Sequence, residues 1–231
     1  PKDYLTKSGF NQAKFYNDLN SDNRKLLGTE QLDWIESKII NSSAVWTIFG
    51  QQVLMAKLKF PDVSKMLKSK EIPSFLKPYL KFLGLGIPSN LDAWDGYPAE
   101  RDKLYKLMSN AKKGFVSLAG DTHNSWVSEL KDKSGSKVGV ELGAPSVTSP
   151  GITDILNLDE KKFVESIVKI NNELQWMDPS NRGYLSLNCM EDKIIASFNY
   201  IKELEEINSE ISSSKSFTLH REGLKLEEIK A

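Results

Sequence analysis

The sequence predicts a layered α/β protein, because segments with strand and helix patterns alternate along its 231 residues. Residues 44–49 (AVWTIF) and 114–118 (GFVSL) are short apolar runs typical of buried strands. A helix pattern precedes each run, over residues 29–40 and 98–111. This order favours sheets covered by helices over an all-β sandwich.

The helix patterns have recognisable beginnings and apolar faces. Thr29 can cap the first helix through its hydroxyl. Four apolar residues then recur at helical spacing: Leu32, Ile35, Ile39 and Ile40. Pro98 suits the first turn of the second helix, and its apolar face carries Leu104, Leu107 and Met108. A third helix is expected over residues 159–172.

Further strands are expected in pairs. Residues 126–130 and 138–142 read as strands joined by the polar turn 131–137. Residues 183–188 and 193–200 read as a hairpin. Its turn is Met190-Glu191-Asp192, and Cys189 before it is expected in the core rather than as a nucleophile.

The chain is expected to form one domain over residues 1–231, without internal repeats. The first 28 residues are polar and irregular, and residues 146–151 form a loop. Residues 56–92 are rich in Lys and Pro, and we interpret them as an insertion wrapped over the core, with helical patches at 63–67 and 74–82. The end of the chain, 203–231, is interpreted as a solvated connection and a last strand at 216–220.

Composition excludes some classes of partner. Lys+Arg and Asp+Glu both count 31, so no global field attracts nucleic acid or an anionic membrane, and we expect no specific nucleic-acid binding. No apolar stretch reaches the roughly 18–20 residues that a membrane helix needs. The chain starts at Pro1 without a signal-peptide pattern, which indicates a processed end or an excised segment, so the compartment cannot be read from it.

The strongest candidate site follows the strand at 114–118, in the sequence Gly120-Asp121-Thr122-His123. Ligands of α/β folds bind beyond the carboxyl ends of strands, and Gly120 allows a sharp turn there. A carboxylate and an imidazole two residues apart can bind one zinc, iron or manganese ion. The alternative is that Asp121 caps a turn and His123 packs. A catalytic centre also needs more ligands than these two.

Three weaker candidates could line a substrate site. The loop 92–98 (DAWDGYP) places Trp94, Asp95 and Tyr97 beside each other, although a packed loop anchored by Trp94 is the alternative. Gln51 and Gln52 follow a strand and can bind a ligand or cap neighbouring backbone. Arg101 can bind phosphate bidentately or pair with Glu100 or Asp102 near solvent. No phosphate-binding loop, dinucleotide fingerprint or nucleophile elbow competes with these candidates.

Taken in order, several blocks resemble the PhoD-like (alkaline phosphatase D) family of metallophosphatases over about residues 24–200. The blocks are 26–31 (LLGTEQ) with Trp34, 46–53 (WTIFGQQV), 92–98 with Arg101, 118–126 (LAGDTHNSW), 140–141 (VE) with 146–151 (SVTSPG), and 182–184 (RGY). Each block is weak alone, and the ordered set is specific.

This resemblance implies a calcineurin-like core, with two mixed β-sheets flanked by helices, and a dinuclear or larger metal centre. The metals would be iron with calcium, or zinc or manganese. Asp121 and His123 would be metal ligands and catalytic residues. The Trp-Asp-Gly-Tyr block, Arg101 and the Gln pair would bind substrate. The reaction would be hydrolysis of phosphate monoesters or diesters by a metal-bound hydroxide.

The resemblance also implies that the chain lacks some of the family's sequence blocks. The family's upstream blocks, which carry most metal ligands, have no counterpart here, and Cys189 does not match the family's cysteine. The chain is therefore expected to be an incomplete, C-terminal part of the enzyme, inactive without its N-terminal remainder. The alternatives are a non-catalytic domain that binds a phosphorylated ligand or a protein, and a structural domain with no site. An extracellular or periplasmic location rests on the resemblance only.

Overall fold

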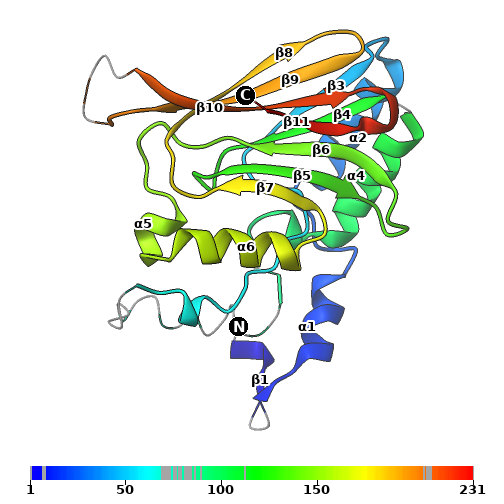
Figure 1. Cartoon of the computed structure of the whole chain (residues 1–231). Coiled ribbons are helices and arrows are strands. Elements are labelled where there is room, and N and C mark those ends of the chain that lie inside the picture. The colour runs from blue at the N-terminus through cyan, green and yellow to red at the C-terminus, as the bar shows by residue number, and fades with distance from the viewer. Residues whose placement is uncertain are drawn as a thin grey trace.

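The architecture is given by a computed structural model of the whole chain (Figure 1). The structure describes residues 2–6, 9–68, 74, 77, 80, 85, 87–88, 90–111, 113–204, 206 and 210–230. Two β-sheets lie against each other, and helices cover the outer face of the larger sheet. This arrangement confirms the predicted α/β class with two sheets flanked by helices.

The larger sheet has five strands and is mixed. Its strands are, in spatial order, β3 (Trp46–Gly50), β4 (Gly114–Ala119), β6 (Lys137–Gly143), β5 (Ser125–Lys131) and β7 (Leu174–Asp178). The pairs β3–β4 and β4–β6 are parallel, while β5 runs antiparallel to both β6 and β7. The carboxyl ends of β3, β4 and β6 therefore meet at one edge of the sheet.

The smaller sheet has four strands, in the order β11-β10-β9-β8. Their bounds are β8 (Gly183–Cys189), β9 (Lys193–Ile201), β10 (Ile211–His220) and β11 (Leu226–Ile229). Every pair is antiparallel, so the prediction of two mixed sheets was wrong for this one. The reason is that neighbours in this sheet are also consecutive in the chain, and a parallel pair would need a longer crossover connection.

The core between the sheets is apolar. Along β9, buried and half-buried residues alternate, as expected for a strand with one face against a core. Ile194, Ala196 and Phe198 of this face pack in one cluster with Val116 and Val140 of the larger sheet. Burial of each large side chain contributes roughly 1.5–3 kcal/mol, so this cluster fixes the two sheets face to face.

Three longer helices pack on the other face of the larger sheet (Figure 1). They are α2 (Gly28–Asn41), α4 (Pro98–Ala111) and α6 (Glu160–Ile170). Ile35 and Leu104 join a cluster under α2 and α4, and Phe163 joins a second cluster under α6. Among the described residues no helix covers the outer face of the four-stranded sheet, so the described layers are sheet, sheet and helices.

The three predicted helices are confirmed, with one correction at an end. The residue before α2 is Leu27, so Thr29 lies inside the first turn and is not the cap. The carboxylate of Glu100 in α4 instead accepts hydrogen bonds from the backbone N–H groups of Leu26 and Leu27, at 2.6 and 2.9 Å. A distant side chain thus holds the start of α2, which local sequence cannot indicate.

Strand β3 lies at the edge of the sheet, so its predicted burial was wrong. It pairs with β4 alone among the described strands, and Ile48 is 44% exposed. The β-branched and aromatic run correctly indicated a strand but not its place in the sheet. The other predicted strands are confirmed, although Cys189, at the end of β8, is exposed rather than in the core.

The segment predicted to be an insertion begins inside the core. Met55, Ala56 and Leu58 are all buried, so residues 56–58 belong to the central structure. The first predicted helical patch is a single 3-10 turn, η2 (Val63–Lys65). Most of the second patch, 74–82, lies outside the described residues.

Several elements were not expected from the sequence. The amino end carries η1 (Lys2–Tyr4), the two-residue strands β1 (Leu5–Thr6) and β2 (Gly9–Phe10), and α1 (Gln12–Leu19). A short helix α5 (Ile152–Leu156) follows the 146–151 loop, and β7 follows α6. At the carboxyl end, β10 is longer than expected, and η4 (Glu222–Leu224) connects it to β11, which is the actual last strand.

Candidate metal centre and active site

The turn Gly120-Asp121-Thr122-His123 leaves the carboxyl end of β4, between the ends of its parallel neighbours. The backbone N–H groups of Gly120 and Asp121 both donate to the carbonyl of Gln52, at 2.9 Å each. The N–H of Ala144, just after β6, donates to the carbonyl of Ala119 at 2.7 Å. The turn is therefore fixed from both sides by backbone hydrogen bonds.

Asp121 and His123 leave this turn toward different neighbours. Asp121 is exposed and lines a cavity, whereas His123 is not among the residues that line it. The ring Nδ1 of His123 lies 3.2 Å from the carbonyl oxygen of Pro150 in the loop after β6. The structure thus places the two donors on one turn, with His123 oriented by the 146–151 loop.

His123 has a strained backbone. Its φ is 58°, in the left-handed region that residues other than glycine rarely adopt. Such conformations persist where the surrounding structure fixes them, and they concentrate at functional sites. The hydrogen bond from its N–H to the carbonyl of Gly120, at 3.2 Å, closes the tight turn that requires this angle.

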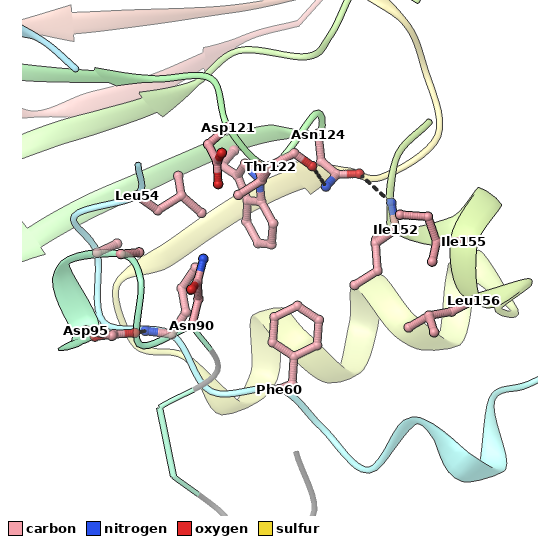
Figure 2. Close-up of a pocket in the computed structure, with 14 residues that line it drawn as sticks. Leu54, Phe60, Asn90, Asp95, Asp121, Thr122, Asn124, Ile152, Ile155 and Leu156 are labelled. Atoms are coloured by element: carbon pink, nitrogen blue, oxygen red, sulfur yellow. Dashed lines mark hydrogen bonds between the residues drawn. The ribbon is translucent and has the colours of Figure 1, made fainter. Parts of the chain in front are cut away.

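The cavity beside Asp121 has a volume of about 390 Å³. Figure 2 shows Asp121, Thr122 and Asn124 along one side of it, with Phe60 and Leu156 across from them. The carboxylate of Asp121 has no hydrogen-bond or ion-pair partner among the described residues, so it is available to a ligand.

The two glutamines after β3 support the site in different ways. The side chain of Gln51 accepts from the indole of Trp94 at 2.7 Å and donates to the hydroxyl of Ser117 at 3.1 Å. Gln52 is exposed and acts on the turn through its carbonyl, as described above. Gln51 thus has internal partners, and these are side chains rather than the neighbouring backbone named in the alternative.

The 92–98 loop is packed rather than open. Trp94 is fully buried in η3 (Trp94–Gly96), and Asp95 and Arg101 are also buried. Nη1 of Arg101 lies 2.7 Å from the Asp95 carboxylate and also donates to the carbonyl of Met55. Arg101 thus has an internal partner, and it does not pair with Glu100 or Asp102 near solvent.

Tyr97 is the half-buried member of this loop, and the guanidinium of Arg24 lies 5.1 Å from its ring centre. Of the predicted substrate-binding residues, only Asp95 lines the cavity beside Asp121. The packed-loop alternative fits Trp94, Asp95 and Nη1 of Arg101, which bind other parts of this chain, while the buried Nε of Arg101 has no hydrogen-bond partner among the described residues. Substrate contact by any of the six residues stays a prediction.

Buried side-chain acceptors hold the segment 55–59, and of these Glu173 and Asn171 were not singled out from the sequence, while Glu141 was noted only within a block. The N–H groups of residues 55–59 have no strand partner and donate to side chains. The acceptors are Glu141 for Met55 and Ala56, Glu173 for Lys57, Asp95 for Leu58 and Asn171 for Lys59. Burial raises the pKa of Glu141 to about 7, against the opposing effect of these hydrogen bonds. A Glu within the apolar strand VGVELG is the one sequence signal that indicates this role.

The structure does not bring a full set of candidate metal ligands together at this turn. Among the residues that the structure describes, no group of three or more His, Cys, Asp or Glu side chains is placed to hold a metal ion. Metal binding by Asp121 and His123 stays a prediction.

Comparison with known proteins settles the family. A family model described as PhoD-like phosphatase matches residues 2–198. The chain belongs to the PhoD-like phosphatase family. This membership confirms the resemblance inferred from the ordered sequence blocks, and it covers the β4 turn, the 92–98 loop and both sheets' first strands.

Two longer proteins are similar to this PhoD-like chain. Alkaline phosphatase D of Bacillus subtilis (strain 168) is 28% identical over 205 residues, which are 87% of this chain and 31% of that protein. A solved structure titled "Structure of PhoD" has a TM-score of 0.68 at 22% identity, and the match covers 94% of this chain and 37% of that one. The second likeness shows the fold. The chain thus spans about a third of the length of these relatives.

In the described part of this PhoD-like chain, no helix has both the length and the apolar character needed to cross a membrane. An extracellular or periplasmic location stays a prediction.

Proposed function

We propose that this chain forms part of a metal-dependent phosphate-ester hydrolase, with Asp121 and His123 as two ligands of its metal centre. The observation that supports this most is the Gly120–His123 turn, which lies at the carboxyl ends of parallel strands beside a cavity, in a member of the PhoD-like phosphatase family. Phosphodiesters as well as monoesters fall within the proposed substrate class.

The orientation of His123 suits a metal ligand. Metal-binding histidines commonly donate one ring N–H to a carbonyl, which fixes the tautomer and leaves the other nitrogen free to coordinate. The contact between Nδ1 and the carbonyl of Pro150 has this geometry, and it leaves Nε2 for the metal. The imidazole must be neutral to coordinate, so metal affinity should fall as acid protonates it.

The carboxylate of Asp121 suits the same centre. It is exposed at the cavity wall and has no competing partner among the described residues, while its backbone is held by Gln52. A carboxylate and an imidazole together suit iron, zinc or manganese, and carboxylates also bind calcium. The remaining ligands would come from a further part of the enzyme, because the described residues offer no third one.

When bound, a metal pair supplies an activated water and neutralises the charge that develops on the phosphate. The role of this chain is to hold Asp121 and His123 in fixed positions through hydrogen bonds from neighbouring segments. Gln52 fixes the turn through its carbonyl, and Gln51 and Trp94 brace the segment that carries Gln52. We propose that these residues position the site. Iron with calcium, or zinc or manganese, are the proposed metals.

The experiment uses the full-length protein that contains this chain, with Asp121→Asn and His123→Ala variants. Bound metal is measured by elemental analysis, and turnover is measured with p-nitrophenyl phosphate and bis-p-nitrophenyl phosphate. Both variants should lose metal and most turnover, and the Gln31→Ala variant on the exposed part of α2 should keep both. Full metal content and activity in both site variants would reject the assignment.

The second candidate is a non-catalytic phosphatase-like domain that binds a phosphorylated ligand or a protein partner. It is favoured by the absence, among the described residues, of any group of three or more candidate metal ligands. The same assay distinguishes it, because wild-type protein that binds phosphate esters without turning them over would support this candidate against the hydrolase.

A further inference from the structure

The cavity beside Asp121 is lined mainly by carbon, which a phosphate group alone does not require. Its apolar wall comes from the segment after β3, from β5 and from α5. The larger apolar residues in this wall are Leu54, Phe60, Trp126, Ile152, Ile155 and Leu156. Figure 2 shows Phe60, Ile152 and Leu156 grouped across from Asp121.

Most polar groups in the cavity wall already have partners, and the side-chain amide N–H group of Asn90 is the exception among those described below. The amide of Asn124 bonds to the backbone N–H at the start of α5 and to the carbonyl of Thr122. The Thr122 hydroxyl accepts from the indole of Trp126 at 2.7 Å. Asn90 accepts a backbone N–H two residues on, and Asp95 is paired as described above. Among the described lining residues, the carboxylate of Asp121 is the charged group left for a ligand.

We propose that this cavity binds the apolar alcohol portion, an aryl or alkyl group, of a phosphate ester whose phosphate lies at the Asp121–His123 turn. The inference rests on the proposed function and specifies its substrate class. An apolar group gains from leaving water for a carbon-lined cavity, whereas a polyol would lose hydrogen bonds to water without replacing them. The volume lies at the lower end of the roughly 300–1,000 Å³ typical of small-molecule sites, which suits one or two aromatic rings.

The position of the cavity indicates which part of the substrate would occupy it. Asp121 lies on its wall, so a group bound there extends from the place where the phosphate would be held. Ile155 of α5 is 52% exposed and still lines the cavity, which places it at the mouth. A charge introduced at Ile155 should therefore oppose binding of an apolar group without disturbing the buried wall.

The test is calorimetric titration of the full-length protein that contains this chain with 1-naphthol, an apolar alcohol without phosphate, and with glycerol as the polar comparison. Naphthol should bind with a negative heat-capacity change, the mark of apolar burial, and glycerol should not bind. Ile155→Asp should weaken naphthol binding at least tenfold. The matched control is Ile170→Asp, at the end of α6, where a half-exposed isoleucine lies outside the cavity lining. It should change the affinity less than twofold.

The outcomes separate this inference from the proposed function. Naphthol carries no phosphate, so its binding does not depend on metal or turnover. Absence of naphthol binding, equal binding by the two Asp variants, or equal binding of glycerol would overturn the inference, even if Asp121→Asn abolishes metal binding in the full-length enzyme. Conversely, selective naphthol binding in a protein without phosphatase activity would keep the cavity assignment and reject the reaction. Circular dichroism of both variants verifies that each is folded.

Discussion

The carboxylate of Glu141 accepts a hydrogen bond from the hydroxyl of Ser117, 3.0 Å away, across two neighbouring strands of the five-stranded sheet. The same carboxylate accepts the N–H groups of Met55 and Ala56, at 2.7 and 2.9 Å. Ser117 in turn accepts from Gln51, which holds Trp94. One buried acid thus joins the central strands to the segments around the candidate site.

Stability should fall as pH rises through the range in which Glu141 ionises. Burial raises its pKa from 4.5 to about 7, so between these values the folded state binds more protons than the unfolded state. The free energy of unfolding therefore decreases from about pH 4.5 to 7, by about 3 kcal/mol from this group. Urea unfolding across this range should show a weaker decrease in Glu141→Gln, because glutamine does not ionise. An unchanged slope in the variant would contradict the prediction.

Breaking the pair between Asp95 and Arg101 should destabilise the fold strongly. Asp95→Ala leaves a buried guanidinium without its carboxylate and removes the hydrogen bond that the N–H of Leu58 donates to Asp95. The expected cost is about 3–5 kcal/mol in the free energy of unfolding. Asp22→Ala, at the exposed pair with Lys103, should cost less than about 1 kcal/mol. If Asp95→Ala kept full stability and changed only substrate affinity, the substrate-binding interpretation would be the correct one.

Proline should be tolerated at one position of β3 and not at the next. The carbonyl of Val45 accepts from Gly114, and the N–H of Gln51 donates to Leu118. Because backbone groups alternate sides along a strand, the N–H of Thr47 faces β4 and that of Ile48 faces the free edge. Thr47→Pro should therefore lower the free energy of unfolding by about 1–3 kcal/mol more than Ile48→Pro. Equal losses in chemical denaturation would contradict this orientation.

Glycine should be more stable than alanine at position 123. The φ of 58° costs an alanine about 1–2 kcal/mol, and glycine adopts it freely. The free energy of unfolding of His123→Gly should thus be about 1 kcal/mol higher than that of His123→Ala in thermal or urea unfolding. Neither variant retains the imidazole. If the alanine variant were as stable as the glycine variant, the turn would not impose this backbone angle.

Local patterns were enough to predict most of the elements. The spacing of Ile35 and Ile39 predicted α2, and the GFVSL run predicted β4, because periodicity reflects which face of an element is buried. The turn carrying Asp121 and His123 was also predicted, since Gly120 follows a strand end. These features depend on neighbours within a few residues.

Other features depend on residues far apart in the chain and were missed or misplaced. The carboxylate that holds the residues before α2 belongs to Glu100, some 70 residues away, and β3 is an edge strand because of the sheet order. The segment 55–59 has neither a helix pattern nor a strand pattern, so most of it was interpreted as the start of an insertion. Its N–H groups are instead satisfied by side chains from the connection between α6 and β7, from β6 and from the 92–98 loop.

The sequence by itself determined the elements, the family and the identity of two candidate ligands, because these are encoded in local composition and in the order of blocks. Only the tertiary structure decided that Arg101 and Trp94 have internal partners, that Asp121 faces a cavity and that His123 faces Pro150. The physical reason is that burial and hydrogen-bond partners are set by long-range packing, which brings together charges and backbone groups that no local pattern relates.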